Sequence, residues 1–146
     1  MAILSTDRIH LGAHAVDRSD AIRQAGQLLV QTGCVTPDYI DGMLAREQTM
    51  STYLGSGVSI PHGMFENREQ ILKTGISVLQ IPAGVVWDEE GEKAHLVIGI
   101  AASSDEHVGV LASLAEAIED EDTTRLLIET TDPHVIMKYL SGSQAE

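Results

Sequence analysis

Apolar residues recur at helical spacing in the first third of the chain and form short runs in its middle. The segment 19–33, SDAIRQAGQLLVQTG, predicts a helix that is capped by Ser19 and stopped by Gly33. Its apolar stripe consists of Ala21, Ile22, Ala25, Leu28 and Leu29. A second helix is expected after Thr36 and Pro37, which supply a cap and a preset φ.

Two short β-branched runs, 75–81 (GISVLQI) and 95–102 (HLVIGIAA), predict strands. The second run is apolar almost throughout, as expected of a central strand that is covered on both faces. Helices are expected after Ser104 and Asp105 and in two later segments, TTRLLIET and PHVIMKYL; Asp132 caps the last. The alternation of helices and strands, without a repeat or linker, predicts a single α/β domain over residues 1–146.

The charge balance limits the partners. Nine basic residues stand against 22 acidic ones, a formal charge of −13, which disfavours nucleic acid and anionic lipid. Two acidic clusters, DEEGE at 88–92 and EDED at 119–122, have two interpretations that stay open: solvated loops that keep the protein soluble, or a negative rim that steers a basic protein partner. Cys34 is the only cysteine, so no internal disulfide can form. We expect a cytoplasmic protein, because the sequence also shows no signal peptide or membrane span.

Two histidines occupy positions where chemistry is plausible. In GSGVSIPHGMFEN (55–67), Pro61 and Gly63 frame His62 on a loop that should follow a strand. A turn histidine and a functional histidine are both compatible with that pattern. His107 should lie in the first turn of the helix after the strand 95–102, at the carboxyl edge where open α/β sheets build their sites. A helix N-terminus binds anions, and the alternative there is a histidine that is merely tolerated in a first helical turn.

The sequence lacks the motifs of several other kinds of active site. There is no HExxH or CxxC for zinc, no GxSxG nucleophile elbow, and no glycine signature for ATP or NAD, so we expect no metal and no cofactor. The remaining hypothesis is a histidine that acts as a nucleophile toward phosphorus. Such a site needs one ring nitrogen that attacks, a partner that holds the other, and donors for the phosphoryl oxygens. Arg46, at the end of the second expected helix, is a candidate donor or else a surface residue.

The segment REQTMSTYLGSGVSIPHG, which begins at Arg46, resembles the active-site signature of the enzyme IIA domains of the bacterial phosphoenolpyruvate-dependent sugar phosphotransferase system, in the mannitol/fructose class. The matching residues are Arg46, Glu47, Thr52, Gly55, Gly57, Val58, Ile60, Pro61 and His62. The early IHLG, the segments HLVIGIAA and EHVGVLASLAEAI, and Gly63 look like the mannitol branch. Ser59 stands where alanine is common, and Met64 where the mannitol branch often has threonine.

The resemblance implies a mixed β-sheet with helices on both faces and a phosphoryl carrier. His62 would accept a phosphoryl group through Nε2 from the phosphorylated carrier protein HPr and pass it to a cysteine of a IIB domain. A IIC membrane domain would then phosphorylate mannitol or a related hexitol during uptake. Arg46 and His107 would flank His62, and Glu47 is expected to orient Arg46. The alternative is a regulatory module of the same fold, whose phosphorylation state controls a partner without sugar transfer.

Overall fold

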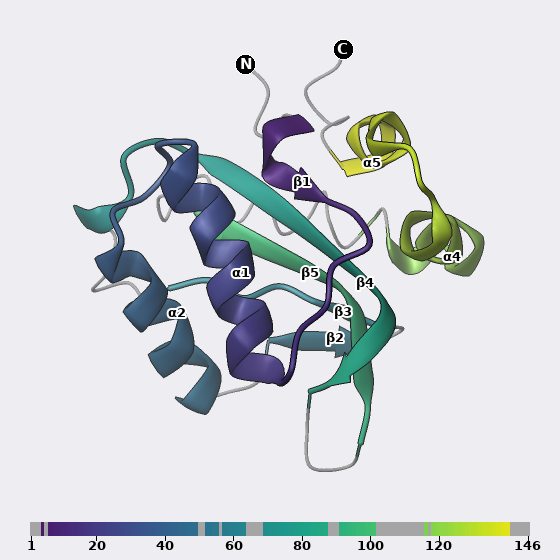
Figure 1. The fold of residues 1–146 in the computed structure, drawn as a ribbon, viewed down its shortest axis with the longest axis horizontal. Coiled ribbons are helices and arrows are strands. Elements are labelled where there is room, and N and C mark those ends of the chain that lie inside the picture. The colour runs from purple at the N-terminus through teal and green to yellow at the C-terminus, as the bar shows by residue number, and fades with distance from the viewer. Residues whose placement is uncertain are drawn as a thin grey trace.

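A five-stranded mixed sheet runs through the molecule, with helices on both faces (Figure 1). The computed structural model describes Leu4 and residues 6–49, 52–55, 57–63, 69–87, 91–101, 116 and 118–140. The elements are η1 (Thr6–Arg8), β1 (Ile9–His10), α1 (Arg18–Gln31), α2 (Asp38–Thr49), β2 (Tyr53–Gly55), β3 (Val58–Ser59), β4 (Gly75–Val86), β5 (Lys93–Ala101), α4 (Glu121–Glu129) and α5 (Pro133–Leu140).

The strand order β1-β4-β5-β3-β2 places β5 at the centre of the sheet. β4 and β5 form a long antiparallel hairpin, β1 runs parallel to β4, and β3 runs parallel to β5. β5 is buried over most of its length, as the apolar run 95–102 predicts. The predicted α/β class, with a mixed sheet between two helical layers, is confirmed.

Two apolar cores, one on each face, hold the layers together. In β5 the side chains alternate: Leu96, Ile98 and Ile100 belong to the core under α4 and α5, while Val97 and Ala101 belong to the core under α1 and α2. Gly99 interrupts the second set because α1 passes close to the strand there. A Cβ at position 99 would lie 2.7 Å from Ser77 Oγ and 3.4 Å from the Ala25 carbonyl oxygen.

The ends of α1 confirm one expected signal and correct another. Asp17, and not Ser19, is the N-cap, and its side chain accepts a hydrogen bond from the Asp20 amide. The predicted cap is wrong because the helix already begins at Arg18, and Asp17, directly before it, is as good a cap as serine. Gly33 does stop the helix, at a φ of 81°, and the Gly33 and Cys34 amides donate to Val30 and Leu29. Cys34 is fully buried, as expected of a small apolar residue.

The carboxyl-terminal helices follow the predicted order. Asp132 caps α5 through a hydrogen bond of 2.9 Å from the His134 amide, and Pro133 opens the helix. The EDED segment is not an open loop, because Asp120 is the N-cap of α4 and Glu121 and Asp122 lie in its first turn. Carboxylates there are favoured by the partial positive charge of a helix N-terminus. Across the described segments, no helix combines the length and apolarity needed to span a bilayer.

Candidate functional site: a histidine at the carboxyl end of the central strand

The backbone around His62 is attached to the end of β5. The Ile100 amide donates to the Pro61 carbonyl oxygen at 3.0 Å, and His62 pairs with Ile100 in an isolated parallel bridge. β3 ends at Ser59, so this short extension carries the chain alongside β5 to its carboxyl edge. The expectation of a histidine on a loop at a strand end is therefore met.

The imidazole of His62 is held by its own backbone. Nδ1 lies 2.8 Å from the Ile60 carbonyl oxygen, and 9% of the residue is exposed. A carbonyl oxygen can only accept, so Nδ1 carries the proton in this hydrogen bond. In the neutral tautomer with this proton, the lone pair lies on Nε2, which is the nitrogen able to attack an electrophile.

A tyrosine from α2 fixes both chain segments beside His62. The Tyr39 hydroxyl donates to the Ile100 carbonyl oxygen at 2.9 Å and accepts from the Gly63 amide at 2.9 Å. Burial raises the pKa of Tyr39, against a smaller lowering by the Gly63 hydrogen bond, so the hydroxyl stays protonated and remains a donor. Sequence analysis missed this residue.

The same helix carries Arg46. Arg46 lies in the last turn of α2, where it is half-buried. It follows Tyr39 by seven residues, which is about two helical turns, so the two side chains leave the helix on the same side. That spacing is the sequence signal that could have identified Tyr39. The structure thus brings the helix of Arg46 against the His62 loop through Tyr39.

Glu47 anchors the segment that leads into the sheet. Its carboxylate accepts hydrogen bonds from the amide and hydroxyl of Thr52, and at 2.9 Å from the indole nitrogen of Trp87. All three residues are almost fully buried. Glu47 therefore ties the end of α2 to β2 and to the end of β4; these contacts do not show the expected orientation of Arg46.

The remaining candidates lie apart from this geometry. His107 falls outside the described residues. His95 lies at the opposite end of β5 from Ile100, with Nδ1 3.2 Å from the Pro82 carbonyl oxygen. Within the segments that are described, no three His, Cys, Asp or Glu side chains form a group that could hold a metal ion.

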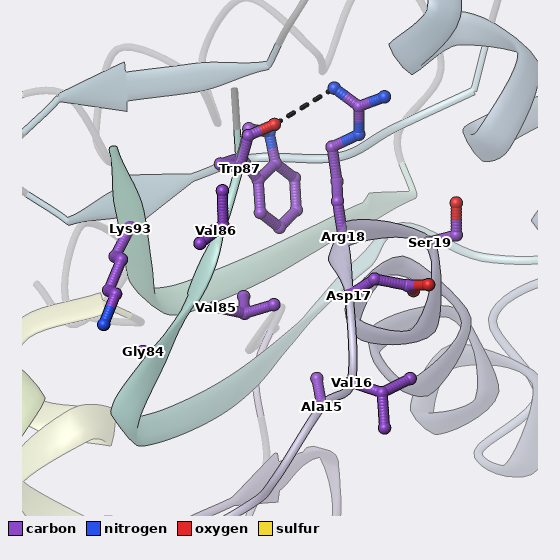
Figure 2. Close-up of a pocket in the computed structure, with 10 residues that line it drawn as sticks. All are labelled: Ala15, Val16, Asp17, Arg18, Ser19, Gly84, Val85, Val86, Trp87 and Lys93. Atoms are coloured by element: carbon purple, nitrogen blue, oxygen red, sulfur yellow. Dashed lines mark hydrogen bonds between the residues drawn. The ribbon is translucent and has the colours of Figure 1, made fainter. Parts of the chain in front are cut away.

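A separate cleft of about 600 Å³ lies between the start of α1 and the β4–β5 hairpin (Figure 2). Arg18 reaches across it and donates to the Trp87 carbonyl oxygen at 3.0 Å. Figure 2 shows that Lys93 and Arg18 do not point toward one another, so they do not form a joint anion site. Neither Arg46 nor His62, the candidate site residues that the structure describes, lines this cleft.

The fold and the strand-end histidine define a small α/β domain that holds one nearly buried imidazole at the carboxyl edge of its sheet. Comparison with known proteins gives the family: a model described as "Phosphoenolpyruvate-dependent sugar phosphotransferase system, EIIA 2" matches residues 2–143. The chain belongs to this family of phosphotransferase components, and the family expected from the sequence is confirmed.

Individual relatives agree with that assignment. The chain is 46% identical over 141 residues to a multiphosphoryl transfer protein of Escherichia coli O157:H7, a match that spans 97% of this chain and 37% of the relative. It is 44% identical over 142 residues to the mannitol-specific EIICBA component of Pasteurella multocida, covering 96% of this chain and 23% of the relative. The chain thus corresponds to about a third or less of these proteins.

The fold is also similar to that of a solved structure. This structure is a complex of enzyme IIAMTL and phosphorylated enzyme IIBMTL from Escherichia coli. The TM-score is 0.89 at 41% identity, and the match covers 94% of this chain and 96% of the other.

Proposed function

We propose that the chain is a phosphoryl carrier in which His62 Nε2 accepts a phosphoryl group from phosphorylated HPr and passes it to a cysteine of a IIB domain. The observation that carries the proposal is the hydrogen bond between His62 Nδ1 and the Ile60 carbonyl oxygen, 2.8 Å long. This hydrogen bond leaves the nucleophilic lone pair on Nε2. During attack, the Ile60 carbonyl oxygen also stabilises the positive charge that develops on the ring.

The transfer balances without a cofactor. The Nε2 lone pair forms a bond to phosphorus while the bond between phosphorus and the donor breaks, and that electron pair stays on the donor. In the second step the sulfur of the IIB cysteine attacks phosphorus, and the electron pair of the N–P bond returns to Nε2. The His62 ring keeps its Nδ1 proton throughout, since Ile60 holds it in place.

Arg46 is proposed to stabilise the charge on the transferred phosphoryl oxygens. Its place in the last turn of the helix that Tyr39 attaches to the His62 loop supports this role. Replacing Arg46 with glutamine should slow transfer by about 10²–10³, the usual effect of losing one such donor. A rate equal to that of the wild type would make Arg46 a surface residue.

His107 is proposed to assist in the same way without carrying phosphate, a role that rests on the family resemblance. His107→Ala should still be labelled on His62, but it should exchange phosphate with HPr more slowly. An early melting temperature with normal exchange would make His107 structural.

Mannitol or a related hexitol is the proposed sugar. Support comes from relatives: one is named as a mannitol-specific component, and the matched complex joins enzyme IIAMTL to phosphorylated enzyme IIBMTL. The similarity to a multiphosphoryl transfer protein is of the same order, so the sugar needs a direct test.

The test is incubation with phosphoenolpyruvate, enzyme I and HPr, followed by addition of a mannitol IIB domain. The wild type should gain one acid-labile phosphate and then lose it to IIB, whereas His62→Ala should gain none. Labelling of His62→Ala would overturn the assignment. Stable phosphorylation without onward transfer to any IIB domain would favour the regulatory alternative.

A further inference from the structure

Two tyrosines bracket β3, and each makes the same pair of hydrogen bonds. At the amino end, the Tyr53 hydroxyl donates to the Lys93 carbonyl oxygen at 3.3 Å and accepts from the Gly57 amide at 3.1 Å. At the other end, Tyr39 donates to Ile100 and accepts from Gly63, both at 2.9 Å. Each hydroxyl thus joins β5 to a glycine amide that flanks the β3 segment.

We propose that Tyr39 is a positioning residue for phosphoryl transfer, because its hydroxyl holds the His62 loop in the geometry that presents Nε2. This inference rests on the proposed function of His62. Tyr39 acts on His62 through Ile100 and Gly63 and not by contact with the phosphoryl group.

The two residues that the Tyr39 hydroxyl bonds, the acceptor Ile100 and the donor Gly63, are the immediate neighbours of His62 in space and in sequence. Ile100 is the residue that His62 pairs with on β5, and Gly63 follows His62 in the chain. Upstream, Pro61 is attached to Ile100 by a backbone hydrogen bond of 3.0 Å. The hydroxyl therefore closes the loop on its downstream side, and His62 is held from both directions.

The hydrogen bonds of Tyr39 restrain the backbone more firmly than those of Tyr53, because Tyr39 is the more deeply buried residue. Tyr39 is 3% exposed and projects from the first turn of α2, whereas Tyr53 is half-buried on the edge strand β2. A displacement of about 1 Å at a reacting nitrogen can cost about 10²-fold in rate, since near-attack geometry is lost. A hydroxyl one residue away from the nucleophile is placed to prevent such a displacement.

Tyr39→Phe tests the proposal, because it removes only the hydroxyl oxygen. Tyr53→Phe is the matched control, because its hydroxyl makes the equivalent pair of hydrogen bonds at the other end of β3. Three quantities are measured in both variants and the wild type: the single-turnover rate of phosphoryl transfer from phosphorylated HPr across donor concentrations, the ¹⁵N shifts of the His62 ring, and the melting temperature.

Both variants should lose about 2–6 °C of melting temperature, because each leaves an amide and a carbonyl without one partner. Only Tyr39→Phe should slow transfer at saturating HPr, by about 10- to 100-fold, with the half-saturating HPr concentration unchanged. Only Tyr39→Phe should shift the His62 ring signals away from the Nδ1–H tautomer toward exchange between the two tautomers.

Wild-type rate and ring shifts in Tyr39→Phe would overturn the inference while leaving phosphorylation of His62 intact. Equal slowing in the two variants would also overturn it, since a general loss of stability would then explain the effect. If the wild type accepted no phosphate, the proposed function would fail instead, and the ring shifts would still report whether Tyr39 positions His62.

Discussion

Ser59 and Ser77 are two fully buried serines of the sheet with opposite hydrogen-bonding states. Ser77 Oγ donates to the Ala25 carbonyl oxygen at 2.8 Å, whereas Ser59 Oγ has no hydrogen-bond partner among the described residues. A buried hydroxyl without a partner costs free energy of folding, because its hydrogen bonds to water are lost and not replaced. Ser59 lies three residues before His62, so this destabilising hydroxyl is close to the proposed nucleophile in the chain.

Ser59→Ala should therefore raise the free energy of unfolding by about 1 kcal/mol, and Ser77→Ala should lower it by about the same amount. Urea unfolding of the two variants beside the wild type measures both. If Ser59→Ala destabilised the protein as much as Ser77→Ala does, the hydroxyl of Ser59 would have a partner after all.

The neighbours of His62 in the sequence mark it directly, whereas the contacts of Tyr39 leave no local mark, for a physical reason. Proline and glycine act on the backbone of their direct neighbours, so Pro61 and Gly63 mark His62 locally. The Tyr39 hydroxyl is connected to Gly63 across 24 residues and to Ile100 across 61, and only the packing of α2 on the sheet creates those contacts. The same holds for Trp87, which meets Glu47 across 40 residues.

At the scale of elements, the Glu47 carboxylate joins α2 to β2 and β4. Glu47→Gln should lower the free energy of unfolding by about 2 kcal/mol, because an amide NH₂ replaces an oxygen that accepts from buried donors. Chemical denaturation measures it, with the exposed Glu129→Gln as a control expected to change stability by less than about 0.5 kcal/mol. If both variants changed the free energy of unfolding by the same small amount, the Glu47 hydrogen bonds would not stabilise the fold.

The cap of α5 gives a pH-dependent contribution. The His134 amide hydrogen bond, followed by the His134 side chain, lowers the pKa of Asp132 from its usual 3.8. A lowered folded-state pKa stabilises the protein above the unfolded value, and that stabilisation is lost as the pH falls through the folded value. The melting temperatures of wild type and Asp132→Ala should differ at neutral pH and converge below pH 3.8. A constant gap would contradict the assignment.

The sequence predicted where helices and strands form more accurately than it predicted the residues at which they begin and end. The stripe of α1 and the Asp132–Pro133 start of α5 are local signals, and both helices form there. β4 begins where the apolar run predicts but continues to Val86, and β5 begins two residues early, because pairing across the hairpin, Val85 with Ala94 and Val86 with Lys93, adds residues that lie outside the two predicted runs.

For the whole molecule, the charge of −13 favours encounter with a basic donor. Glu121 and Asp122 are exposed in the first turn of α4, so part of the EDED cluster faces solvent. Transfer from HPr at low donor concentration should slow as ionic strength rises, since the Debye length falls to about 8 Å near 0.15 M salt. A flat salt profile would assign the acidic clusters to solubility alone.

The central claim concerns one atom, His62 Nε2, and the position of the phosphate on the ring tests it most directly. Protein labelled with ¹⁵N in its histidines would be phosphorylated by phosphoenolpyruvate, enzyme I and HPr, and phosphorus–nitrogen couplings would be recorded by NMR. We predict one phosphohistidine, at His62, bonded through Nε2 while Nδ1 keeps the proton that it donates to Ile60. Phosphate on Nδ1 of His62, or on any other residue, would contradict it.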